Sequence, residues 1–283
     1  MTEWLGFPVN AAAHGAALDR MTGFIHWGMA ALAIGWGTFF VYVLFKFRAG
    51  RHPEAIYQGA KGRLSTASEV AVIVAEIALL LVFAIPTWAN WVRLPGPEAG
   101  ALQVRMVGEQ FAWNFHYPGP DGVFGRTRPD LMDSTNPVGL DRSDAAAADD
   151  FTTINQLHVQ VDRPVVVHLT SKDVIHSFGV PVMRVKQDAI PGLSLPVHFT
   201  PVMTNPEEAK FPACAAKKTC WEIACAQLCG LGHFRMRGFL NVHSAADYAA
   251  WAASQAPQAA APAAPAATSP PAAPATAPPA TGT

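Results

Sequence analysis

Two long apolar segments constrain this chain more than any other feature of its sequence. Residues 24–45 form a run of 22 residues without Asp, Glu, Lys or Arg. At about 1.5 Å of rise per residue, a helix of this length reaches about 33 Å, enough to cross a bilayer core. A second segment, residues 70–92, contains one acidic residue, Glu76, and ends in Trp88 and Trp91, which suit a membrane interface. The sequence therefore predicts a transmembrane helical hairpin over residues 22–94.

Basic residues predict the orientation of this hairpin. The segment between the apolar runs carries five of them against one acid, Glu54, whereas Arg20 is the only basic residue before the first run. Because positive charge stays on the cytoplasmic side, we expect this loop inside, and residues 1–21 and the C-terminus outside, in a bacterial inner (plasma) membrane. The first twenty residues lack the basic region and the short apolar core of a cleaved secretory signal. We therefore expect the first helix to serve as an uncleaved signal. The five basic residues are Lys46, Arg48, Arg51, Lys61 and Arg63.

After residue 95 the pattern changes to short β-branched or alternating segments separated by Pro, Gly and Asp. Such segments are typical of strands, and their spacing favours an all-β antiparallel sandwich with Greek-key connections over residues 95–250. Residues 251–283, which are almost entirely Ala, Pro, Ser and Thr, predict a disordered tail. The clearest strands are residues 102–107, 111–117, 154–161, 165–170, 195–200 and 239–243.

The charge pattern excludes one class of partner. A formal net charge of −1 argues against nucleic acid. Residues 121–150 nevertheless concentrate Asp in a segment that interrupts the strand pattern. This segment is either a solvated surface loop or a surface that presents carboxylates to a basic protein partner.

One run, residues 225–236, offers two thiols, an imidazole and a thioether from Cys225, Cys229, His233 and Met236. Sulfur ligands select copper, and imidazole also binds it. Zinc sites rarely use methionine, iron–sulfur clusters need four thiolates, and the sequence has no CxxC or CxxCH motif. The run therefore predicts a copper site in a loop between two late strands. The alternative is a loop with a structural disulfide, in which the histidine and the methionine bind nothing.

Other residues complete or adjoin this run. If the site holds two copper ions bridged by the two thiolates, it needs one more imidazole. His176, which directly follows a strand segment, can point into such a loop-built site. Cys214 and Cys220 precede the run. On the oxidising outer side we expect a disulfide between them, and the alternative is that one of them binds or delivers metal.

Several motifs in one order resemble subunit II of the haem–copper cytochrome c oxidases. An Asp-x-x-His-Ser segment is found at residues 173–177, Asp-Ala-Ile-Pro-Gly at residues 188–192, and an aromatic segment at residues 108–115. The resemblance covers residues from about 22 to 245 and implies a cupredoxin-like sandwich with a binuclear copper centre, CuA. The family's Cys, Glu or Gln, Cys, His, Met pattern falls on Cys225, Gln227, Cys229, His233 and Met236.

The resemblance also implies a role for each residue. Cys225 and Cys229 would bridge two copper ions. His176 and His233 would cap one ion each. Met236 and the backbone carbonyl of Gln227 would bind weakly.

The implied function is that of the electron-accepting subunit of a respiratory cytochrome c oxidase. Cytochrome c would reduce the copper centre, from which electrons pass to a haem in subunit I. That partner would reduce O2 and pump protons, and subunit III is a further expected partner. The alternative from another class is a membrane-anchored copper carrier or assembly factor that binds one copper(I) ion reversibly.

Three positions depart from the family pattern. Gln227 replaces a glutamate whose side chain can help to bind magnesium, so we assume no magnesium site. Phe111 replaces a tryptophan at which electrons enter, so that role falls to Phe111 or to Trp113. Leu193 replaces an arginine that often follows Pro-Gly.

Two acids in the second apolar region are candidates for a proton path into subunit I. Glu69 matches, in its distance to Pro86, an acid that the family places near such a path; the alternative is an ordinary interfacial carboxylate. Glu76 lies about 10 Å deeper by helical rise and is expected to pack against subunit I.

Overall fold

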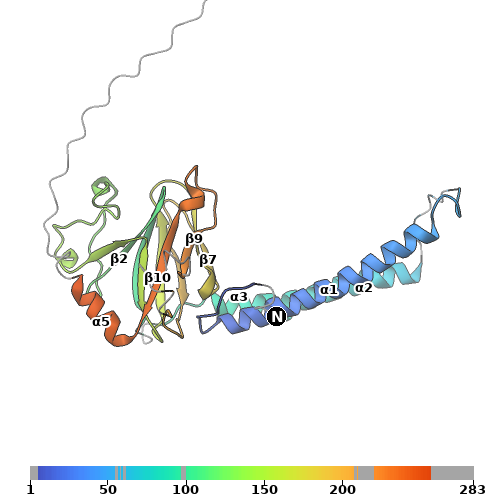
Figure 1. The fold of residues 1–283 in the computed structure, drawn as a ribbon, viewed down its shortest axis with the longest axis horizontal. Coiled ribbons are helices and arrows are strands. Elements are labelled where there is room, and N and C mark those ends of the chain that lie inside the picture. Colours follow the sequence, from blue (N-terminus) through green and yellow to red (C-terminus); the bar gives the residue numbers. More distant parts are fainter. Residues whose placement is uncertain are drawn as a thin grey trace, which may run out of the picture.

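The computed structural model of this chain consists of a long helical hairpin and a β-sandwich (Figure 1). It describes residues 6–54, 57, 59, 62–96, 100–206, 209 and 220–255. The predicted tail lies outside these residues from position 256 onward. Two apolar helices followed by a sandwich confirm the predicted architecture at this level.

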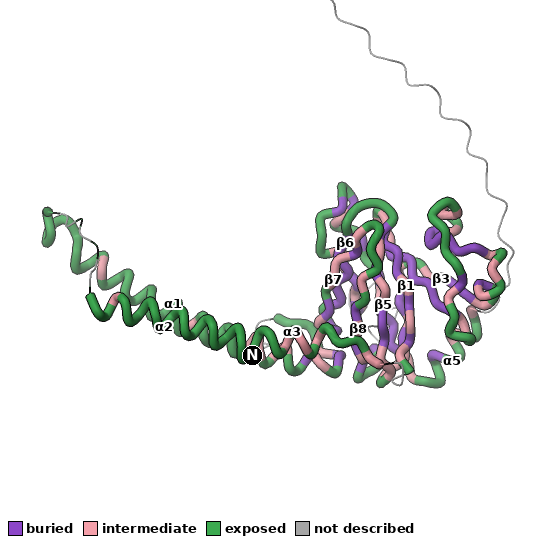
Figure 2. Tube along the Cα trace, turned by 180° about the vertical axis from the view of Figure 1, so that it is seen from behind, coloured by how far each residue is buried: buried purple, intermediate pink, exposed green. Residues whose placement is uncertain are grey.

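The hairpin is formed by α1 (Gly15–Lys46) and by a second helical segment that spans Arg63–Trp91. Both are long and apolar enough to cross a membrane. Figure 2 shows the hairpin as almost entirely exposed, which is what lipid-facing apolar side chains require. The second segment consists of α2 (Arg63–Leu79), a π-helical turn (Leu80–Ala84) and α3 (Ile85–Trp91). The π turn ends two residues before Pro86, which has no N–H and would clash with the preceding turn of a regular α-helix.

Two five-stranded sheets pack face to face in the sandwich. One has the order β3-β2-β1-β5-β8 and the other the order β4-β10-β9-β6-β7. The strands of the first sheet are β1 (Leu102–Glu109), β2 (Ala112–Tyr117), β3 (Phe151–Ile154), β5 (Val165–Ser171) and β8 (Leu195–Phe199). Those of the second are β4 (Gln156–Gln160), β6 (His176–Val180), β7 (Val185–Ala189), β9 (Glu222–Cys225) and β10 (Arg237–His243).

The strand pattern differs from the prediction in two respects. The sheets are mixed, because β1 pairs with β5, and β4 with β10, in parallel; the purely antiparallel expectation is therefore wrong, and Greek-key connectivity stays a prediction. The single strand predicted over residues 154–161 is divided between the sheets at Asn155, whose φ is 57°. This side chain accepts a hydrogen bond from Trp113 N–H at 2.8 Å, which fixes the crossing point.

Large buried side chains fill the space between the sheets, among them Trp113, Phe115 and Phe178, all fully buried. Strand β2 is also covered on its outer face, by the Asp-rich loop that leads from β2 to β3. There His116 on β2 meets Asp150 at 2.6 Å, and both side chains are fully buried. Other carboxylates of the loop, such as Asp144, accept hydrogen bonds from its own backbone. These carboxylates therefore shape the loop.

The sandwich is attached to the hairpin by the segment before α1. Ala11 N–H donates to the Val182 carbonyl and Ala13 N–H to the Thr200 carbonyl, at 2.9 and 3.0 Å. Asp19 on α1 forms an ion pair with Arg184 at 2.7 Å. Residues 11–13 are thus docked on the sandwich, where Ala12 forms an isolated antiparallel bridge with Pro201.

A final helix, α5 (Ala245–Ser254), which the sequence pattern does not predict, packs against the sandwich. The Ser244 side chain caps it by accepting a hydrogen bond from Asp247 N–H. The helix continues four residues beyond the expected end of the sandwich at residue 250, because Trp251 packs against the aromatic cluster of Tyr117, Phe151 and His158.

Candidate metal centre

Three loops meet at one end of the sandwich and bring the predicted ligands together. The β5–β6 loop leads into His176, the first residue of β6. The β9–β10 connection, here called the cysteine loop (residues 225–236), starts at the end of β9 and includes the short 3-10 helix His233–Arg235. The third loop is the tight turn between β1 and β2 at Gln110 and Phe111. Pairing of β6 with β9, which sets Phe178 opposite Cys225, places the first two loops side by side.

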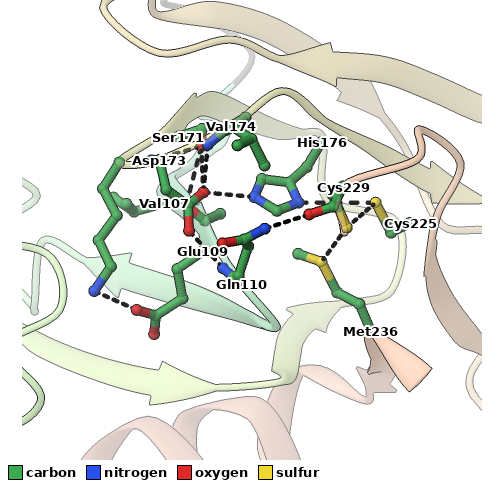
Figure 3. Close-up of polar contacts among 12 residues, drawn as sticks. Val107, Glu109, Gln110, Ser171, Asp173, Val174, His176, Cys225, Cys229 and Met236 are labelled. Carbon is green, nitrogen blue, oxygen red and sulfur yellow. Dashed lines mark hydrogen bonds and ion pairs between the residues drawn. The ribbon is translucent and has the colours of Figure 1, made fainter. Parts of the chain in front are cut away.

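The sulfur and nitrogen atoms of this end lie within a few ångström of one another (Figure 3). Cys225 Sγ and Cys229 Sγ are 3.8 Å apart. Each thiol also faces an imidazole, since Cys225 Sγ is 3.9 Å from His176 Nδ1 and Cys229 Sγ is 3.6 Å from His233 Nδ1. Met236 Sδ lies 3.7 Å from Cys229 Sγ. The carbonyl of Gln227 lies 3.2 Å from Cys225 Sγ.

His176 is oriented by Asp173. Its Nε2 donates to Asp173 Oδ1 at 2.8 Å, which leaves Nδ1 directed toward Cys225. Burial disfavours the charged imidazole, but hydrogen bonds with Cys225 and Asp173 outweigh it and raise the pKa of His176 above its usual value. Burial likewise opposes ionisation of Asp173, yet hydrogen bonds from His176 and from Gln110 N–H lower its pKa. A carboxylate behind an imidazole fixes the tautomer that a metal ligand needs.

The two thiols differ in their ease of ionisation. Burial raises the pKa of Cys225, but hydrogen bonds with His176 and with backbone groups outweigh burial and lower it below the ordinary value. Burial and the neighbouring Cys225 raise the pKa of Cys229. Both cysteines are free thiols. His176, Cys225 and Cys229 form a group that can hold a metal ion, and its soft sulfur atoms suit copper.

The β1–β2 turn closes the site from the side. Phe111 packs on the cysteine loop so closely that a Cβ at Gly232 would lie 2.4 Å from its ring. Gly230 is also required by its backbone, with φ of 128°. Trp113 is fully buried and its ring meets that of His176 edge to face at 6.0 Å, whereas Phe111 is half-buried.

The other predicted residues lie away from this site. Glu69 and Glu76 are exposed on α2 of the hairpin. Cys220 is disulfide-bonded, and Cys214, its expected partner, lies outside the described residues. Leu193 is exposed in the connection between β7 and β8.

Two residues of the site received no role from sequence reasoning. Asp173 could have been assigned one, because its spacing of three from His176 is compatible with a carboxylate–imidazole pair. Gln110, whose side chain bonds to the carbonyl of Cys229, gives no such signal, since the two residues are 119 positions apart.

The hairpin, the sandwich and the Cys–His–Met cluster together define a membrane-anchored β-sandwich protein with a group of side chains that can hold a metal ion. The model of the family "Cytochrome C oxidase subunit II, periplasmic domain" matches residues 102–241. The chain belongs to the cytochrome c oxidase subunit 2 family, as a membrane subunit of a haem–copper oxidase complex with its sandwich domain on the outer side.

Two curated relatives bear out this membership. The chain is 32% identical over 218 residues to the alternative cytochrome c oxidase subunit 2 of Bradyrhizobium diazoefficiens, covering 77% of this chain and 72% of the relative. It is 26% identical over 262 residues to cytochrome c oxidase subunit 2 of Cereibacter sphaeroides, covering 87% and 78%. The solved periplasmic domain of subunit II of cytochrome oxidase of Bradyrhizobium japonicum aligns with 59% of this chain and 99% of its own length, with a TM-score of 0.39 and 24% identity.

Proposed function

We propose that this subunit accepts electrons from cytochrome c at a binuclear copper centre and delivers them to the haem of subunit I. The observation that carries the proposal is the paired arrangement of donors. Two thiols lie 3.8 Å apart, and each has its own imidazole nitrogen within 4 Å, at 3.9 and 3.6 Å. Such an arrangement suits two metal ions that share two thiolates.

The residues present fit that pair of ions. Cys225 and Cys229 would bridge them, and His176 and His233 would cap one each. Met236 Sδ and the Gln227 carbonyl lie close enough to the thiols to act as additional weak ligands. Two copper ions held by these residues would supply a one-electron carrier.

The remaining protein groups hold this arrangement and limit access to it. Asp173 fixes the ring of His176, and the low pKa of Cys225 favours the thiolate that a metal needs. Trp113, fully buried, packs behind His176 and is out of reach of a soluble donor. We therefore assign the site at which electrons enter to the half-buried Phe111.

The proposal includes the wider setting of the subunit. Both termini and the sandwich, residues 95–250, lie outside, and the loop between the helices of the hairpin, residues 22–94, lies inside. The hairpin contacts subunit I, which reduces O2 and pumps protons, and subunit III completes the complex. Glu69 and Glu76 on the exposed surface of α2 contribute to the path by which protons reach subunit I.

The test is a copper analysis with electron paramagnetic resonance of the full chain, purified in detergent and loaded with copper. We expect two coppers per chain that share one unpaired electron, and fast reduction by cytochrome c. A single copper(I) ion that exchanges readily would instead support a copper carrier. Absence of copper binding would overturn the proposal.

A further inference from the structure

The turn between β1 and β2 contacts both loops that carry the candidate ligands. Toward the β5–β6 loop, Lys172 N–H donates to the Gly108 carbonyl at 3.1 Å, and the Lys172 ammonium pairs with Glu109. Gln110 N–H also donates to Asp173 Oδ2 at 2.7 Å. The turn is therefore fixed firmly to the loop that holds His176.

Toward the cysteine loop, the turn makes a different contact. Gln110 Nε2 donates to the Cys229 carbonyl at 2.5 Å, as Figure 3 shows. Among the residues that the structure describes, this side-chain amide is the only hydrogen-bonding group of the Gln110–Phe111 turn that reaches the cysteine loop. One residue thus contacts both halves of the site, through its backbone on one side and its side chain on the other.

Close packing leaves this amide little freedom. A Cβ at Gly230 would lie 2.6 Å from Gln110 Nε2 and 3.2 Å from the Phe111 ring. The loop can approach the turn this closely only because positions 230 and 232 are glycines. Gln110 is therefore held against the cysteine loop at the peptide that follows Cys229.

We propose that Gln110 is a positioning residue that sets the separation of the two halves of the metal centre. Its backbone N–H holds Asp173 and, through it, His176, the candidate ligand at the end of the β5–β6 loop. Its side-chain amide holds the carbonyl of Cys229 and, through it, the half formed by Cys229 and His233. The inference rests on the proposed function, because two shared thiolates bind a pair of ions only while the two loops keep one spacing.

The test compares three variants of the full chain in the purified oxidase. Gln110→Ala removes the whole side-chain amide, and Gln110→Glu keeps its shape but places a carboxylate where the donor was. Neither change removes the backbone N–H that binds Asp173. Gln160→Ala serves as the matched control, because Gln160 ends β4 opposite His243, at the other end of the sandwich.

Loss of this hydrogen bond should release copper to a chelator about three to ten times faster in both Gln110 variants and leave the control unchanged. Paramagnetic NMR should show shifted Cys229 β-protons and nearly unchanged His176 ring protons, a pattern that general loosening of the fold would not give. Thermal unfolding of the copper-free protein reports whether each variant folds.

The possible results separate the inference from the function on which it rests. If Gln110→Glu behaves like the unmodified protein, the donor has no positioning role, and the inference is wrong. It is equally wrong if both Gln110 variants keep the unaltered copper signal and release rate. If the unmodified chain binds no pair of coppers, the proposed function fails before the variants are compared.

Discussion

The two ends of the sandwich each contain a histidine beside another ring or thiol, fully buried at His176 and partly buried at His158, but the two histidines are held in opposite electrostatic surroundings. At the metal end, His176 has a carboxylate on one nitrogen and a thiol on the other, and its pKa is raised. At the other end, His158 Nδ1 lies 2.8 Å from His243 Nε2, and its ring stacks on Trp251 with centroids 4.1 Å apart. Burial, and then the charge of His243, lower the pKa of His158 to about 3.

The difference shows that burial alone does not decide what an imidazole can do, because its partners can reinforce the effect of burial, as at His158, or outweigh it, as at His176. A carboxylate fixes the tautomer of His176 and leaves one nitrogen directed at the thiols. Burial and a second imidazole keep His158 neutral, and its ring holds helix α5 on the sandwich by stacking on Trp251. The metal end is therefore arranged to bind a ligand, and the other end to stabilise the fold.

The largest expected effect comes from removing one of the two thiols that we propose to bridge the copper ions. Cys229→Ser should reduce copper from two ions to at most one per chain and slow cytochrome c oxidation about 100-fold or more, because a hydroxyl is a poor ligand for soft copper. Metal analysis and resonance spectra check this, with Ser143→Ala in the Asp-rich loop as a control. A variant that still binds two coppers sharing one electron would contradict the assigned bridge.

The second-largest expected effect is a loss of folding stability in acid, caused by His158 at the end of the sandwich away from the cysteines. His158 takes up a proton near pH 6.5 when unfolded but only near pH 3 when folded, so stability is lost as the pH falls between these values. The loss attributable to His158 is on the order of 5 kcal/mol over that range. His158→Gln should give a shallower dependence of the free energy of unfolding on pH, measured by urea titration. His14, whose pKa is also lowered, adds a dependence of the same sign in both proteins. Parallel curves for the two proteins would show that His158 does not titrate in this way.

A third prediction removes the indole that covers His158. Trp251→Ala should lower the free energy of unfolding by about 2–3 kcal/mol, less than for a fully buried tryptophan because part of this ring is exposed. The copper spectrum should not change, since α5 contacts none of the candidate ligands. Ala250→Ser, at an exposed position of the same helix, is the control. An altered copper spectrum would mean that the two ends are coupled.

The smallest predicted change concerns the carboxylate behind His176. Asp173→Asn keeps a hydrogen-bond acceptor but removes its charge, and copper affinity should fall about tenfold, or about 1.4 kcal/mol. Competition with a chelator measures this affinity, and the effect should appear in the His176 ring signals rather than in those of His233. Unchanged affinity would show that Asp173 serves only to shape the β5–β6 loop.

Much of this architecture follows from local sequence. The apolar runs predict the two helices because charge-free segments of this length have few other places to lie. The spacing of Cys225, Cys229, His233 and Met236 predicts a shared site because all four belong to one loop. His176 could be added because it comes shortly after the strand segment predicted at residues 165–170, although it is itself the first residue of β6. In each case neighbouring residues carry the information.

Tertiary structure alone decided the rest. The sequence did not predict strands β6, β7 and β9, and the parallel pairing of β1 with β5 depends on how distant segments align. Contacts between other distant segments place Gln110 on the carbonyl of a residue 119 positions away and Trp251 on His158. The sequence by itself determined which chemical groups and which membrane segments the protein has. Sheet register determined which of those groups meet, because contacts between distant segments arise only when the strands that carry them are paired.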